Sequence, residues 1–188
     1  MKKILSRLVT EVEEARKRFV NTAVNFTHEQ GNFKPSPDVW SAAEITEHLV
    51  YAEFGGICGM YIALEKVKNG LRTWEEENPH KGLSIEEIIS RTWREKETVP
   101  DPASPRMGGS LAFWITALES NKQVLEKLTA NLDGINLEDT IQAHPISGPM
   151  DIRQRYEFLR FHIDRHREQV IRLHQQEEFP SKGEKYFI

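Results

Sequence analysis

Apolar residues recur every three or four positions through most of this chain, which is the spacing of an amphipathic α-helix. In the first segment these positions fall on one helical face: Leu5, Leu8, Val12, Ala15, Phe19, Ala23 and Phe26. The pattern predicts a helix over about residues 2–27. The stretch HEQGNFKPSPDV follows, and its glycine and two prolines predict a break.

The same pattern predicts three more long helices. Ser41 and Glu44 form a capping box, in which each side chain hydrogen-bonds an amide of the first turn, so the second helix starts there. It ends near Asn69–Gly70, a common C-terminal stop. The third helix spans about residues 110–131, and the fourth starts near Asp151, a suitable N-cap.

The segment between the second and third helices, residues 71–108, is long and is rich in proline and glycine near its end. A second capping box, Ser84 with Glu87, predicts a short helix within it. We find no convincing strand pattern. We therefore predict an all-α fold, a four-helix bundle with a long connection between helices 2 and 3, which lets these two helices run parallel. We expect one domain over residues 1–180 and a C-terminal tail over residues 181–188.

Composition narrows the class of protein. The 188 residues are 38% hydrophobic and 29% charged, with a formal net charge of −4. This small negative charge argues against nucleic acid as a partner, and no apolar run has the length of a membrane span. The single cysteine, Cys58, excludes an internal disulfide and suits a reducing compartment. We expect a cytoplasmic protein without a membrane partner.

Three histidines are predicted to point inward from two helices. His162 and His166 lie four positions apart in RFHIDRHREQV, so they share one side of the fourth helix and can reach one ion. His48 lies on the face of the second helix that carries Ile45 and Leu49. A hydrogen-bonded core histidine is the alternative for each residue. Three together favour a metal site, because buried polar groups are costly without partners.

Two stretches of the chain resemble motifs of the DinB-like metalloenzyme superfamily, which also includes thiol-dependent transferases of bacteria. WSAAEITEHLVYAE is similar to the helix 2 motif, in which a tryptophan and a capped helix start precede a ligand histidine. HPISGPMDIRQRYEFLRFHIDRHREQV is similar to the C-terminal motif, with two histidines at i and i+4 and a glutamine three positions further on. The resemblance implies a four-helix bundle with His48, His162 and His166 as metal ligands.

Four more polar residues are candidates for contacts around such a site: Gln169, Arg155, Tyr51 and Asn121. Gln169 could orient a ligand or a bound water, and Arg155 could bind an anionic substrate group. Tyr51 could donate a proton, and Asn121 could reach the pocket. The alternatives are solvated side chains for Gln169 and Arg155, a packed core residue for Tyr51, and a hydrogen bond to a neighbour for Asn121.

Other residues allow two interpretations or point away from a site. Gly55, Gly56 and Gly59 in FGGICGM cost helix stability, and either close helix packing, which we favour, or room for a substrate explains them. Glu47 is expected on a solvated face. His80 is expected at the surface.

The expected chemistry follows from the ligand count. Three protein ligands leave at least one coordination position open, which is typical of catalytic metal sites. The run HIDRH lacks the glutamate of the HExxH metalloproteases. We expect a metal-dependent enzyme that acts on a small molecule, as a hydrolase or as a thiol S-transferase with a low-molecular-weight thiol. The alternative is a metal-binding or stress-response module without catalysis.

The sequence names neither the substrate nor the catalytic residues. The expected ion is a divalent transition metal, nickel or zinc in the first place, with iron and manganese as alternatives. The resemblance also implies a homodimer.

Overall fold

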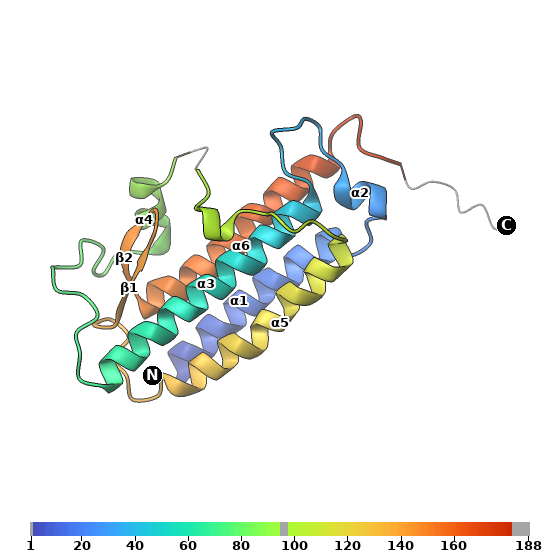
Figure 1. Cartoon of the computed structure of the whole chain (residues 1–188). Helices are drawn as coiled ribbons and strands as arrows, with labels where there is room; N and C mark the ends of the chain where they lie inside the picture. Colours follow the sequence, from blue (N-terminus) through green and yellow to red (C-terminus); the bar gives the residue numbers. More distant parts are fainter. Residues whose placement is uncertain (1, 95–97, 182–188) are drawn as a thin grey trace.

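The computed structural model describes residues 2–94 and 98–181. Four long helices lie side by side in it: α1 (Lys2–Ala23), α3 (Ala42–Lys68), α5 (Leu111–Asn131) and α6 (Ile152–His174) (Figure 1). α1 and α3 each pack against both α5 and α6. One hydrophobic core lies between them, with Phe19, Leu49, Leu118 and Leu159 as one contribution from each helix. The prediction of a mostly helical protein is confirmed.

The directions of the helices decide which residues meet. α3 and α5 run the same way in Figure 1, and α1 and α6 run opposite to them. Between α3 and α6, His48 lies next to His162, whereas the later residue Gly56 lies next to the earlier residue Arg155. The antiparallel pair α3 and α6 therefore brings the start of one helix level with the second half of the other.

Helix starts lie where the capping residues predict them. Ser41 and Glu44 cap α3 reciprocally, and Ser84 caps the short helix α4 (Ile85–Thr92) in the same way. Asp151 caps α6. The end of the first helix is predicted wrongly, because α1 stops at Ala23 and a separate helix α2 (His28–Asn32) begins with its own capping box at Thr27. That box satisfies the first-turn amides locally, which favours a new start over continuation.

The segment from Asn69 to Ser110 links α3 to α5 and contains α4 and the 3₁₀ helix η1 (Asp101–Ala103). α4 lies against α6 and forms a small second hydrophobic cluster with Met150 and Phe158.

A β-hairpin precedes α6, so the prediction of a fold without strands is wrong at this place. β1 (Ile141–His144) pairs antiparallel with β2 (Gly148–Asp151), and His144 lies opposite Gly148. Each strand has only four residues, and β2 contains glycine and proline, so the alternation of buried and exposed positions that marks a strand is absent. Gly148 has a φ of 73°, which a glycine adopts without strain at the turn.

Among the described residues, no helix combines the length and the apolar character needed to cross a membrane. The single domain over residues 1–180 stays a prediction. Of the tail predicted for residues 181–188, only Ser181 lies within the described residues.

Candidate metal centre

Three imidazole rings meet between α3 and α6. Nε2 of His162 lies 3.3 Å from Nε2 of His48 and 3.0 Å from Nε2 of His166. One ring nitrogen from each of the three residues lies within 4.8 Å of the other two. Nitrogens that bind one ion at about 2.0–2.1 Å stand roughly 3–3.4 Å apart. The spacing therefore fits a single metal ion between the three rings.

Local structure sets these positions. The cap at Ser41 places His48 about two turns into α3, and the spacing of four residues puts His162 and His166 on one side of α6. Aromatic rings surround them. The Phe158 ring stacks on His162 at 5.4 Å and 18°, and the Trp40 ring lies 5.1 Å from His48. These contacts give the imidazole rings apolar surroundings.

The other ring nitrogens are held from outside the cluster. Nδ1–H of His48 donates to the carbonyl of Ala103, at 2.8 Å, and Nδ1–H of His166 donates to Oε1 of Gln169, at 2.7 Å. Both acceptors are oxygens without hydrogen, so Nδ1 carries the proton in each ring. The lone pair is then on Nε2, which faces the centre. This is the arrangement in which metal-binding histidines are oriented by a neighbouring oxygen.

Burial keeps the three rings neutral. His48, His162 and His166 are only 4%, 7% and 6% exposed. Burial lowers the pKa of His48, and it lowers the pKa of His166 to about 3, where the nearby His48 contributes too. The pKa of His162 lies well below its ordinary value, first because of burial and then because of the neighbouring histidines. Neutral imidazole is the form that binds a metal, so protons do not compete at neutral pH.

A model of the DinB superfamily matches residues 11–170 of the chain. The chain belongs to the DinB superfamily. The matched range contains all three histidines and both motifs that carry the resemblance, so the family assignment made from the sequence is confirmed. No curated protein and no solved structure matches the chain.

Of the other candidates in this DinB-superfamily protein, Gln169 contacts a site histidine, as described above. Tyr51 packs its ring against Trp114, at 5.7 Å, and under the guanidinium of Arg106, at 4.3 Å. Burial raises the pKa of Tyr51, and its hydroxyl has no hydrogen-bond partner among the described residues. These contacts place Tyr51 beside the segment that precedes α5.

Asn121 belongs to a polar network in the helical core. Its amide donates to the carbonyl of Val50 and to Oε2 of Glu53, at 3.3 Å in both cases. The other oxygen of Glu53 accepts from Arg16, which also binds Glu13. Arg16 and Glu53 are each 2% exposed, so this network links α1, α3 and α5 inside the protein. The contacts of Asn121 fit the hydrogen-bonding interpretation.

Arg155 is 2% exposed, so its interpretation as a solvated side chain is wrong. Gly56 makes this position possible, because a Cβ there would lie 2.9 Å from Nη2 of Arg155. At Gly59, a Cβ would lie 2.6 Å from Nε2 of Gln142. At Gly55, a Cβ would have no atom within 4 Å. Close packing therefore explains Gly56 and Gly59 but not Gly55.

Two buried residues were assigned wrongly. Glu47 is 1% exposed rather than solvated, and its carboxylate accepts the backbone N–H groups of Arg106 and Met107, both at 2.7 Å, and of Gly108, at 3.1 Å. His80 is 8% exposed, and its Nε2 bonds to the carbonyl of Ser147 at 2.8 Å. The burial of Glu47 could have been predicted from its place within the mostly buried run at the start of α3. No local sequence pattern indicates that His80 is buried.

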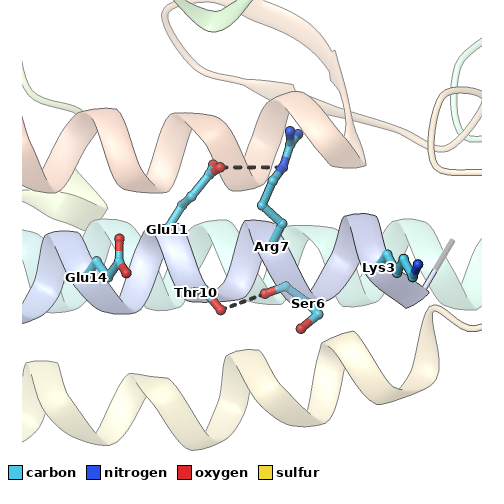
Figure 2. Close-up of a pocket in the computed structure, with 6 residues that line it drawn as sticks. All are labelled: Lys3, Ser6, Arg7, Thr10, Glu11 and Glu14. Carbon is cyan, nitrogen blue, oxygen red and sulfur yellow. Dashed lines mark hydrogen bonds and ion pairs between the residues drawn. The ribbon is translucent and has the colours of Figure 1, made fainter.

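A surface hollow on α1 lies apart from this site. Figure 2 shows the residues that line it: Lys3, Ser6, Arg7, Thr10, Glu11 and Glu14. Arg7 pairs with Glu11 at 3.5 Å, and the Thr10 hydroxyl donates to the carbonyl of Ser6. The residues that line the hollow precede Arg18 in α1. Arg18 pairs with Asp164, which lies between His162 and His166 in the sequence. Its lining residues are one solvent-facing side of a helix, and none belongs to the histidine cluster.

Proposed function

We propose that this protein is a metal-dependent enzyme that acts on a small molecule. His48, His162 and His166 bind one divalent transition metal ion within a four-helix bundle. The observation that carries the proposal is the convergence of three Nε2 atoms, 3.0 and 3.3 Å apart, on two helices. The orientation of His48 by Ala103 and of His166 by Gln169 supports it.

The donor set suits the ions expected from the sequence. Imidazole nitrogens bind nickel, zinc, iron and manganese, and we propose nickel or zinc. When bound, the ion lowers the pKa of a coordinated water or thiol and polarises a carbonyl. Trp40 and Phe158 lie against the rings, so the protein supplies a site with little water around it. Interactions between charges are stronger in such surroundings.

The contacts of Glu47 bear on the type of reaction. Glu47 is the acidic residue next to His48 in sequence, and both of its oxygens accept backbone amides. It is therefore engaged in structure and is a poor general base. A bound ion would lower the pKa of a thiol and of water alike, so neither nucleophile would need a carboxylate base. The contacts of Glu47 argue only against hydrolysis with Glu47 as the base, and we propose thiol S-transfer, with a low-molecular-weight thiol as the second substrate, or hydrolysis without that base.

The alternative is a metal-binding or stress-response module without catalysis. The small exposed fractions of the three rings, 4–7%, favour it, because a substrate must reach the ion. Activity separates the two functions. A protein that binds the ion and transfers no thiol and hydrolyses no ester is a module.

The test begins with metal analysis of the purified protein, followed by thiol-conjugation and esterase panels. We expect about one ion per chain in the wild type and little in His162→Ala. His144→Ala is the matched control, since His144 lies near Phe158 but its Nδ1 accepts the amides of Ile146 and Ser147. Equal metal content in the wild type and His162→Ala contradicts the three-histidine site.

A further inference from the structure

Arg155 is a buried cation that pairs with no carboxylate of the described residues. Its Nε and Nη1 atoms are buried and have no hydrogen-bond partner among the described residues. Burial lowers the pKa of Arg155 to about 10, so the guanidinium is still charged at neutral pH. Removing a charge from water is costly unless an opposite charge or hydrogen bonds compensate. The residues that the structure describes therefore supply no negative charge to compensate the Arg155 guanidinium.

The charge of Arg16, the other arginine that is 2% exposed, is compensated by carboxylates. Arg16 binds the carboxylates of Glu13 and Glu53. The described part of the protein thus gives one buried arginine two acidic partners and leaves Nε and Nη1 of another, on the helix of the candidate metal ligands, without hydrogen bonds. This difference points to a bound molecule as the partner of Arg155.

Arg155 and the candidate metal ligand His162 contact the same aromatic ring. Its guanidinium lies 5.2 Å from the centre of the Phe158 ring, and Phe158 stacks on His162. The ring of His144 lies 4.3 Å from the same phenyl ring. Arg155 precedes His162 by seven residues, about 10 Å along the helix axis. Seven residues are about two turns, so Arg155 and His162 lie on the same side of α6, and Phe158 contacts both.

We propose that Arg155 binds a carboxylate group of the small molecule whose other end lies at the metal ion. The placement of the other end of the molecule at a metal ion rests on the proposed function. A planar guanidinium presents parallel N–H donors that match the two oxygens of a carboxylate. One fixed positive charge is balanced by one negative charge, which favours a carboxylate over a doubly charged phosphate. The substrate class is a monocarboxylate with its reactive group at the far end.

The experiment measures anion binding by calorimetry and by thermal unfolding at constant ionic strength. Acetate and butyrate are the carboxylate probes, and inorganic phosphate is the second arm. We expect both carboxylates to bind the wild type and raise its Tm. Binding to Arg155→Met should be about tenfold weaker or more, equal to roughly 1.4 kcal/mol or more. Arg160→Met is the matched control, because Arg160 lies on the same helix and pairs with Glu86 near the surface.

Two further variants sharpen the result. Arg155→Lys keeps the charge but loses the paired donors, so its carboxylate affinity should fall between those of the wild type and Arg155→Met. His162→Ala removes a metal ligand and should still bind butyrate, so loss of the metal site and loss of the anion site are seen separately. Equal carboxylate binding by the wild type and Arg155→Met overturns the proposal, and so does binding of phosphate without carboxylate.

Discussion

The buried histidines make the stability of the metal-free protein depend on pH in a predictable direction. In the unfolded chain an imidazole has its ordinary pKa of 6.5, whereas burial holds the pKa of His166 at about 3 in the folded protein. Between these values the unfolded chain binds a proton that the folded protein does not. The stabilisation is therefore complete above about pH 6.5 and is lost as the pH falls toward 3.

The size of the effect follows from the same two pKa values. Unfolding takes up one proton per buried imidazole, so each pH unit below 6.5 costs about 1.4 kcal/mol. Going from pH 7.5 to 5.5 lowers the free energy of unfolding by about 1.4 kcal/mol for His166 alone. The pKa values of His48 and His162 are lowered in the same direction, so both rings add to the loss of stability at low pH.

Urea unfolding of metal-free protein at pH 7.5, 6.5 and 5.5 measures this dependence. In His166→Ala the loss between pH 7.5 and 5.5 should shrink by about 1.4 kcal/mol. His28→Ala serves as the control, because His28 is exposed and its removal should leave the dependence unchanged. A wild type that is as stable at pH 5.5 as at pH 7.5, or a pH dependence that His166→Ala leaves intact, refutes the reasoning.

Three other predictions concern single features. Gln169→Ala should weaken metal binding about 10- to 100-fold in a chelator competition, because His166 loses the oxygen that orients it, whereas the exposed Glu168→Ala should bind metal normally. Glu47→Ala should lower the free energy of unfolding by about 3 kcal/mol, since three backbone amides lose their acceptor; a change below 0.5 kcal/mol in urea contradicts that role. Sedimentation at micromolar concentration should show a homodimer, with the exposed Phe54 and Ile62 of α3 as apolar surface, and a monomer alone contradicts this.

The parts of the fold that were predictable depend on contacts within a few residues. The capping boxes at Ser41 and Ser84 are local hydrogen bonds, so the helix starts could be read from the sequence. The same holds for His162 and His166, whose spacing alone puts them on one side of α6. His48 needed the apolar pattern of its own helix and the family resemblance.

The parts that could not be predicted depend on distant partners. His80 is buried because it bonds to Ser147, which is 67 positions away, and Glu47 because it binds amides about 60 positions away. The carbonyl of Ala103 holds His48 across 55 positions, and nothing in the sequence near either residue marks this pair. That Nε and Nη1 of Arg155 have no partner among the described residues follows only from the arrangement of its neighbours in space.

The buried network of Arg16, Glu53 and Asn121 also fixes the position of α3 along its own axis. A slip of α3 by one turn, about 5.4 Å, would preserve much of its apolar packing, since α3 is apolar on most sides. The same slip would separate Glu53 from Arg16 and Asn121 and leave buried charges unpaired. It would also carry His48 away from His162 by more than a metal–ligand bond. A protein with this network replaced by apolar residues could thus fold as stably and still lose its metal site through misregistration of one helix.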